Sequence, residues 1–263
     1  MPVDALCNGG SPKEHSSDRL DNEHDILKLT IGPSTTRCRA GIPDERTVEG
    51  MNIGIIGAGN IGATAARLFA EAGHSMAIGN SRGPGSLEGL VAEIGPNARA
   101  ATVEDAALFG EVVLVAIPYE RHETLPAAEL NGKVVIDATN YYEGRDGLID
   151  FGGLTSSELV ARYLSGARLV KAFNTMYYET LATAGSKSYE DRLVLFVAGD
   201  DADAKAVVSR LIDEIGFAPV DTGTLREGGR VQQPGSSIYN NPMTDEQARA
   251  TLSGMSRGES SGG

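Results

Sequence analysis

Short apolar runs alternate along this chain with longer segments in which apolar residues recur every three or four positions. Buried strands are predicted where the apolar runs lie, at residues 52–56, 75–79, 98–101, 112–117, 134–138, 169–173, 193–198 and 218–221. Amphipathic helices are predicted between or after them, at residues 61–72, 87–94, 103–108, 156–164, 202–215 and 245–252. Such alternation is typical of a parallel sheet with helices on its faces. We therefore expect an α/β fold, a doubly wound and mostly parallel sheet with extra C-terminal strands.

A glycine-rich turn joins the first predicted strand to the first predicted helix. Gly57, Gly59 and Gly62 form the spacing G-x-G-x-x-G at this junction. The first glycine permits a tight turn, the second lets the backbone approach a pyrophosphate, and the third allows close packing of the helix on the strand. The helix start at Asn60 and Ile61 offers free N–H groups to the same pyrophosphate. The motif predicts a dinucleotide-binding, Rossmann-type fold, with a turn that serves packing alone as the alternative.

The end of the second strand predicts which dinucleotide is bound. An NAD-specific site usually has Asp or Glu about 20 residues beyond the motif, where it accepts hydrogen bonds from the ribose hydroxyls. This sequence has Asn80 there, followed by Ser81 and Arg82. Asn80 and Ser81 can donate to a 2′-phosphate, and Arg82 can pair with its charge. We therefore predict NADP(H) as the cofactor, with a solvated Arg82 in a surface loop as the alternative.

Residues at the ends of the later strands complete the predicted cofactor site, because ligands of such sheets bind beyond the carboxyl ends of the strands. Ile117 and Pro118 end the fourth strand, Asn140 follows the fifth, and Asn174 follows the sixth. The two amides can orient a nicotinamide carboxamide or a substrate carbonyl. Because asparagine also caps turns, strand termination alone is the alternative role of either amide.

The sequence contains no clear catalytic group, and we leave the catalytic residue unassigned. A carbonyl reductase needs a Lys, His or Tyr that gives a proton to the developing alkoxide. The candidates are Tyr141, Tyr142 and His122, which could equally be wall or surface residues, and Arg145 and Asp146 are predicted to form a local ion pair. Direct hydride exchange between NADPH and a second redox cofactor needs no such donor, since the protein supplies only stacking and orientation.

Composition and charge exclude several partners. The chain has 263 residues, of which 41% are hydrophobic, and a net charge of −13. An acidic surface argues against binding to nucleic acid or to an anionic membrane. Because neither a spanning segment of about 20 apolar residues nor a signal peptide is evident, we expect a cytoplasmic protein. Both cysteines, Cys7 and Cys38, fall within the first 50 residues, so no metal site is predicted.

Three regions are predicted along the chain. Residues 1–50 lack periodic apolar positions and are predicted to be a disordered extension, although translation starting at Met51 would explain the same pattern. Residues 51–252 are predicted to form the NADP-binding domain, in which residues 235–240 form a loop over the cleft and a candidate wall of the acceptor site. Residues 253–263 are rich in Gly and Ser and are predicted to be a flexible tail.

Six segments of the sequence resemble one known family. They read GIIGAGNIG, GNSRGP, VAIPY, DATNYYEGRDG, VKAFNT and QPGSSIYN, and they are similar to the NADP-dependent coenzyme F420 reductase-like family over about residues 51–245. The first part is also similar to the NADP-binding domain of pyrroline-5-carboxylate reductases. The resemblance implies direct hydride transfer between NADPH and the deazaflavin F420 in a homodimer, with the three glycines, Ser81 and Arg82 in contact with NADP.

Together these observations predict an NADPH-dependent oxidoreductase that transfers hydride between NADP(H) and a flavin or deazaflavin, a small-molecule redox acceptor. Another acceptor, such as a quinone, is compatible with the same mechanism. Two alternatives remain open at this point. One is a non-catalytic NADP(H)-binding sensor, in which the nucleotide shifts a partner-binding surface. The other is an NADPH-dependent carbonyl or imine reductase that uses Tyr141, Tyr142 or His122 as its proton donor.

Overall fold

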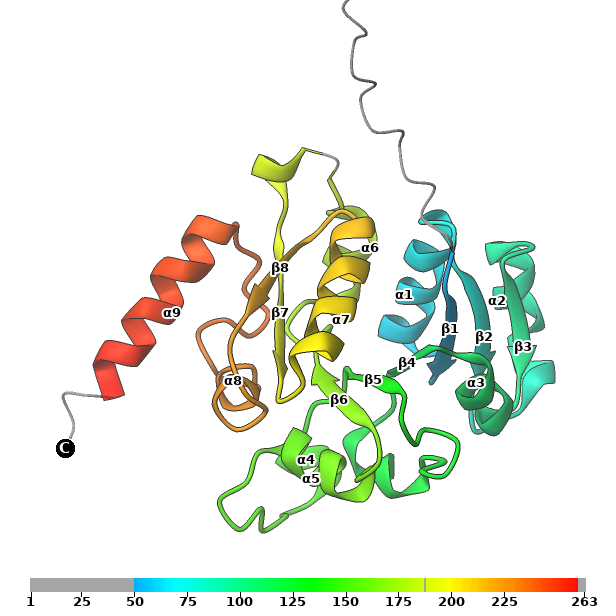
Figure 1. Cartoon of the computed structure of the whole chain (residues 1–263), viewed down its shortest axis with the longest axis horizontal. Helices are drawn as coiled ribbons and strands as arrows, with labels where there is room; N and C mark the ends of the chain where they lie inside the picture. Colours follow the sequence, from blue (N-terminus) through cyan, green and yellow to red (C-terminus); the bar gives the residue numbers. More distant parts are fainter. Residues whose placement is uncertain (1–49, 187, 260–263) are drawn as a thin grey trace, which may run out of the picture. The chain divides into compact units, whose positions relative to one another are not determined.

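The computed structural model describes residues 50–186 and 188–259 (Figure 1). Of the predicted disordered extension at residues 1–50, all but Gly50 lies outside the described residues. The strands of the described part are β1 (Asn52–Ile56), β2 (Ser75–Gly79), β3 (Ala98–Ala101), β4 (Val112–Val115), β5 (Val134–Asp137), β6 (Arg168–Lys171), β7 (Val194–Gly199) and β8 (Ala218–Asp221).

Helices connect these strands. They are α1 (Asn60–Glu71), α2 (Glu88–Ile94), α3 (Val103–Phe109), α4 (Glu143–Asp146), α5 (Ser156–Tyr163), α6 (Tyr178–Thr183), α7 (Ala202–Glu214), α8 (Glu227–Val231) and α9 (Asp245–Glu259). Short 3-10 helices are η1 (Pro84–Leu87), η2 (Tyr119–Thr124) and η3 (Tyr189–Asp191). None of the helices in the described part of the chain is long and apolar enough to cross a membrane.

The strands form one eight-stranded sheet in the order β3-β2-β1-β4-β5-β6-β7-β8 (Figure 1). Strands β1 to β6 pair in parallel, and the strand order changes direction between β1 and β4. Strand β7 is antiparallel to β6, and β8 is again parallel to β7. This arrangement confirms the predicted fold class, a Rossmann-type doubly wound sheet with extra C-terminal strands. Ligands of such sheets bind outside the carboxyl ends of the strands, where the order changes.

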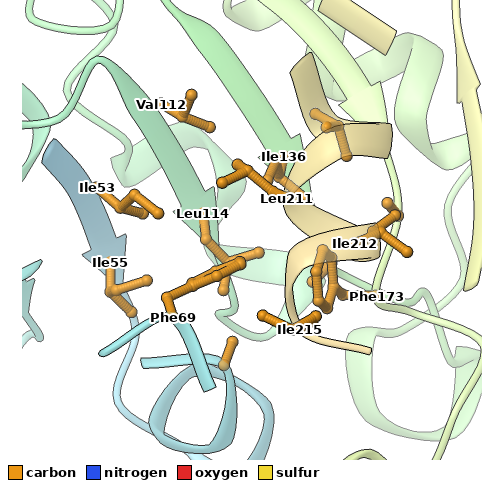
Figure 2. Close-up of a cluster of buried hydrophobic side chains, with 14 of the residues drawn as sticks. Ile53, Ile55, Phe69, Val112, Leu114, Ile136, Phe173, Leu211, Ile212 and Ile215 are labelled. Atoms are coloured by element: carbon orange, nitrogen blue, oxygen red, sulfur yellow. The ribbon is translucent and has the colours of Figure 1, made fainter. Parts of the chain in front are cut away.

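Apolar side chains alternate between the two faces of the sheet, so that both faces are buried. In β4, Val112 and Leu114 belong to one hydrophobic cluster, whereas Val113 and Val115 belong to another. The first cluster includes residues of α1, α6 and α7, and Figure 2 shows Phe69 of α1 beside the strand residues. The second cluster includes residues of α3 and α5. Burial on both faces explains why the sequence of this strand is entirely apolar.

The C-terminal segment packs on the last two strands and ends later than predicted. A third hydrophobic cluster contains Val194 of β7, Ile238 of the loop after α8, and Ala248 of α9. The prediction ended the last helix at Leu252, but α9 continues to Glu259. Leu252 and Met255 of α9 also pack against this cluster, so the helix continues into the segment predicted to be a flexible tail.

Three strands end earlier than predicted. Strand β4 ends at Val115, β5 ends at Asp137, and β6 ends at Lys171. Two residues after β6, Phe173 has a φ of 63°, which is incompatible with an extended strand. The chain turns at this point, and the turn carries Asn174 to the carboxyl edge of the sheet.

Candidate functional site

A cleft of about 390 Å³ opens at the carboxyl ends of the central strands. Residues from the start of α1, from the ends of β4, β5 and β6, and from the C-terminal loop share its lining. Eight of the residues predicted for the site line it: Gly59, Asn60, Ile61, Ile117, Pro118, Asn140, Tyr142 and Asn174. The fold therefore brings together residues from separate motifs at the edge of the sheet where the strand order changes.

Gly57 and Gly62 lie beneath the cleft and allow the turn to pack tightly. Gly57 has a φ of 102°, and its N–H donates to Gly79 O at 2.8 Å. A Cβ on Gly57 would lie 2.3 Å from Ala116 O, and a Cβ on Gly62 would lie 1.8 Å from Gly57 O. Any side chain at either position would displace the backbone, so both glycines are required by the packing of α1 on the sheet.

Gly59 has a different setting, because a Cβ at this position would meet no atom within 4 Å. Gly59 is the N-cap of α1, and no side chain caps this helix. By contrast, side chains of Thr102, Thr155 and Asp201 cap α3, α5 and α7. The first turn of α1 also contains no acidic residue. Open space beside uncapped helical N–H groups fits the pyrophosphate of a dinucleotide.

The loop after β2 holds the residues predicted to select NADP(H), and it lies outside the lining of the cleft. The Oδ1 atom of Asn80 accepts from the N–H of Arg82 at 2.9 Å, and its Nδ2 atom donates to Ser86 Oγ at 3.0 Å. The Asn80 amide thus holds the turn together. Ser81 and Arg82 are exposed, and no carboxylate of the described residues pairs with the Arg82 guanidinium. Both side chains remain available to a phosphate.

The amides of Asn140 and Asn174 meet between the ends of β5 and β6. Asn140 Nδ2 donates to Asn174 O at 2.8 Å, and Asn174 Nδ2 donates to Asn140 Oδ1 at 3.2 Å. Asn174 Nδ2 also donates to Gln232 O at 2.9 Å, which ties the sheet edge to the segment after α8. The two predicted strand-end amides therefore form one hydrogen-bonded pair in the wall of the cleft.

A buried ion pair supports this amide pair, and the sequence analysis missed it. Lys171 Nζ donates to Asp137 Oδ2 at 3.2 Å across the β5–β6 ladder, and also to Thr139 O. Asp137 accepts from Thr139 N at 2.9 Å and from Ser157 Oγ at 2.8 Å. Burial lowers the pKa of Lys171, while Asp137 acts in the opposite direction. The ion pair fixes the end of β5, which leads into Asn140. The available signal for this ion pair in the sequence was one charged residue in each of the two apolar runs.

Positive φ angles mark two points of the cleft wall. Among the described non-glycine residues, Phe173 has a φ of 63° and Asn240 has a φ of 51°, and both line the cleft. The Phe173 ring packs at 5.8 Å on that of Phe69, edge to face, so the hydrophobic core holds the unfavourable conformation in place. Asn240 N donates to Thr175 O at 2.9 Å and fastens the C-terminal loop to the cleft. Such conformations are often found at functional sites.

Two tyrosines from distant segments meet in the cleft. The hydroxyl of Tyr142, after β5, hydrogen bonds with that of Tyr239 in the C-terminal loop. The Tyr142 N–H donates to Asp146 Oδ2 at 2.7 Å, and the Arg145 guanidinium lies 5.0 Å from the centre of the Tyr142 ring. The predicted ion pair between Arg145 and Asp146 is confirmed, with Nε and Oδ1 at 2.7 Å. Burial, followed by the Tyr142 hydrogen bond, raises the pKa of Tyr239.

The segment after β6 contributes further side chains that the sequence analysis did not select. Met176, Tyr177 and Tyr178 line the cleft, and Tyr177 is 57% exposed. A tyrosine ring at a cleft rim offers an apolar face on which a planar ligand can stack. The adjacent tyrosines in TMYYET, soon after a predicted strand, were the available signal, because ligands of such sheets bind beyond the strand ends.

Tyr141 and His122 do not line the cleft, whereas Tyr142, the third catalytic candidate, does. The Tyr141 hydroxyl donates to Gly147 O at 2.8 Å, and its ring packs against Tyr119. His122 stacks on Tyr119 with ring centres 4.9 Å apart, and its Nδ1 atom lies 2.9 Å from Tyr119 O. Because successive residues of an extended segment point in opposite directions, Tyr142 reaches the cleft while Tyr141 enters the core.

Comparison with known proteins agrees with this class of fold. The family model described as NADP oxidoreductase, coenzyme F420-dependent, matches residues 52–141. The crystal structure of a hypothetical protein from Sinorhizobium meliloti is 36% identical and has a TM-score of 0.68, with 74% of this chain and 96% of that chain covered. The chain belongs to this family of NADP-dependent oxidoreductases, and NADP(H) is the corresponding cofactor.

Two further relatives are informative. A crystal structure from Arthrobacter sp. FB24, assigned provisionally as an F420-dependent NADP-reductase, is 26% identical, with a TM-score of 0.57 and coverage of 67% of this chain and 86% of that chain. Metalloreductase STEAP3 of Rattus norvegicus is 31% identical over 186 residues, which is 70% of this chain. The chain spans only 36% of the length of that metalloreductase.

Proposed function

We propose that this protein transfers hydride from NADPH to a flat, flavin-like acceptor that binds in the cleft. The observation that carries the proposal is the aromatic lining next to the glycine turn, where Tyr142, Tyr177, Tyr178 and Tyr239 accompany Gly59. Aromatic rings favour planar ligands, because they stack on them over a large area. The relative described as an F420-dependent NADP-reductase and the metalloreductase both act on redox acceptors by name, which supports a redox acceptor here.

The cofactor would lie across the change in strand order. In this proposal, the N–H groups at Gly59, Asn60 and Ile61 bind the pyrophosphate, and Ser81 with Arg82 binds the 2′-phosphate. Ile117, Pro118, Asn140 and Asn174 then surround the nicotinamide end. When bound, NADPH supplies the hydride. The open space at Gly59 and the exposed Arg82 guanidinium support this orientation.

Catalysis would depend mainly on positioning. The Asn140–Asn174 pair is held by the buried Lys171–Asp137 ion pair on one side and by Gln232 O on the other. A wall fixed in this way can hold the nicotinamide ring with one face against the acceptor ring, so that the reacting atoms stay within the distance that hydride transfer requires. Hydride exchange between two ring systems needs no protein acid at the carbon that receives the hydride.

A second candidate function is favoured by one specific observation. The hydroxyls of Tyr142 and Tyr239 lie inside the cleft, where a carbonyl or imine reductase would need a proton donor. Transfer of a tyrosine proton to a developing alkoxide would then limit the rate and make it depend on pH. This function requires an oxygen or nitrogen atom of the substrate to reach the tyrosine pair.

Oxidation of NADPH in the presence of different acceptors tests the proposal. The full chain is incubated with F420, FMN, a quinone, and a set of ketones and imines, and the loss of NADPH absorbance is recorded beside the binding of NADPH and NADH. We expect turnover with a flavin-like acceptor and tighter binding of NADPH than of NADH. Turnover with the carbonyl or imine compounds alone would favour the second candidate, and tight NADPH binding without any turnover would contradict both.

A further inference from the structure

The side-chain amide of Asn174 has a fixed orientation. Asn174 is 3% exposed and lines the cleft. Its Nδ2 atom donates to Gln232 O at 2.9 Å and to Asn140 Oδ1 at 3.2 Å. Because Gln232 O is a main-chain carbonyl and can only accept, the nitrogen must face it, and Oδ1 takes the other position.

This Oδ1 atom lacks a donor. Among the described residues, none donates a hydrogen bond to Asn174 Oδ1, although the atom is shielded from solvent. Buried carbonyl oxygens are nearly always hydrogen bonded, because an unpaired one loses its interaction with water without compensation. The preceding residue, Phe173, has a φ of 63°, which is also unfavourable. Two unfavourable features at adjacent residues of one cleft wall are typical of a site that a ligand completes.

The chemistry of the missing partner follows from the atom. A carboxylate, a phosphate or a keto oxygen has no proton to give, whereas an amide N–H or a hydroxyl group has one. Both protons of Asn140 Nδ2 are directed at other acceptors, Asn174 O at 2.8 Å and the Tyr239 hydroxyl at 3.4 Å, so the pair itself cannot satisfy Oδ1. A ligand that satisfies Oδ1 must therefore bring a donor to this wall, and the carboxamide N–H of a nicotinamide is such a donor.

We propose that Asn174 Oδ1 accepts a hydrogen bond from the carboxamide N–H of the nicotinamide ring, and so sets the rotation of that ring in the cleft. This inference rests on the proposed NADP(H) site. An imide N–H of a flavin-like acceptor could donate to Asn174 Oδ1 in the same way, and it is the alternative source of this hydrogen bond. Because Oδ1 is shielded from solvent, the cleft wall has to shift when the ligand N–H approaches it.

The test compares two nucleotides that differ in this N–H group. In the 3-acetylpyridine analogue of NADP⁺, a methyl ketone replaces the carboxamide, so the carbonyl remains and the N–H is lost. Calorimetric titration of the full chain should give about tenfold tighter binding of NADP⁺ than of the analogue. In Asn174→Ala, the two nucleotides should bind about equally, mainly through weaker binding of NADP⁺. Asn174→Ser, a substitution that keeps a small polar side chain, is the second variant if the alanine variant is unstable.

The ratio of the affinities for NADP⁺ and the analogue distinguishes the loss of one hydrogen bond from a general structural effect of the substitution. A purely structural role of Asn174 would weaken both nucleotides and leave the ratio unchanged, which would overturn the inference. Equal binding of both nucleotides by the unmodified protein would overturn it as well, while the proposed NADP(H) site would stand. Failure of both to bind would contradict the proposed function itself. If instead riboflavin loses its advantage over 3-methylriboflavin in Asn174→Ala, the N–H belongs to the acceptor and the assignment to nicotinamide is wrong.

Discussion

The hydroxyl of Tyr142 is hydrogen bonded to the hydroxyl of Tyr239, although the two residues lie 97 positions apart in the chain. Each tyrosine is held by its own surroundings. Asp146 and Arg145 fix Tyr142, whereas Tyr239 follows the fully buried Ile238. The C-terminal loop therefore forms part of the cleft wall, and the residues after the nucleotide-binding strands do not form the whole wall by themselves.

Removal of one hydroxyl from this pair distinguishes the two candidate functions. For Tyr239→Phe, we expect unchanged NADPH affinity and a kcat within about threefold of the unmodified protein, because hydride exchange needs no tyrosine proton. If tyrosine is the acid of a carbonyl reductase, kcat falls about a hundredfold or more, and its dependence on pH changes. Tyr189→Phe is the matched control, since Tyr189 is 62% exposed and lies outside the cleft. Steady-state kinetics over a range of pH provide the measurement.

Arg82 tests the choice between the two nicotinamide cofactors. Arg82→Ala should weaken NADPH binding at least about tenfold, because a charge-assisted hydrogen bond to the 2′-phosphate contributes about 1.5–3 kcal/mol. NADH has no such phosphate and should bind with unchanged affinity. Arg121→Ala, a change of an exposed arginine in η2, is the control. Equal losses for NADPH and NADH in Arg82→Ala would contradict the assignment.

Alanine substitutions at Gly59 and Gly62 should have different effects, the first mainly on NADPH affinity and the second mainly on the free energy of unfolding. In Gly59→Ala, the new methyl group meets no protein atom within 4 Å and the φ of −77° suits alanine, so the free energy of unfolding should fall by less than about 1 kcal/mol, the cost of a poorer N-cap residue. The methyl group would occupy the space we assign to the pyrophosphate, and NADPH affinity should fall about tenfold or more. In Gly62→Ala, the methyl group would lie 1.8 Å from Gly57 O, and overpacking should lower the free energy of unfolding by about 1–3 kcal/mol or more.

Urea denaturation and calorimetric titration of both glycine variants check this pair of expectations. The position of the pyrophosphate is wrong if Gly59→Ala binds NADPH as tightly as the unmodified protein. The packing role of Gly62 is wrong if its alanine variant is as stable as the unmodified protein.

The buried ion pair beneath Asn140 should dominate local stability. Lys171→Met leaves the Asp137 carboxylate buried without its counter-charge, so we expect a loss of about 3–5 kcal/mol in the free energy of unfolding. Adding Asp137→Asn removes the remaining charge and keeps an oxygen for Thr139 N, and the double variant should regain much of the loss. Urea denaturation at neutral pH measures both. If the double variant is no more stable than the single one, charge imbalance is not the cause.

The sequence predicted the framework of the site because that framework is local. The bounds of β1 and β2 agree with the predicted strands, since each is an apolar run with a polar residue or glycine at its ends. The glycine turn has a fixed spacing with one physical reason for each glycine. The strand-end amides Asn140 and Asn174 follow from the rule that parallel strands end at a common edge.

The remainder of the site depends on contacts between distant segments. The meeting of Tyr142 and Tyr239 requires the path of the C-terminal loop, which no local pattern specifies. Pairing of Lys171 with Asp137 requires the register between β5 and β6, and one residue of slippage would place these side chains on opposite faces. Tyr141 and His122 were candidates because they follow predicted strands, and the direction of each side chain, toward Tyr119, could not be predicted from that position.

The most direct test of the account is to follow hydrogen from NADPH into the acceptor. The full chain is mixed with F420 and NADPH that carries deuterium at the transferring position, and the reduced deazaflavin is examined by mass spectrometry. Direct hydride transfer predicts that the label appears on a carbon of the reduced F420 and that transfer of deuterium is slower than transfer of hydrogen. Binding of NADPH without reduction of F420 or any flavin, or loss of the label to water, would contradict hydride transfer in this cleft.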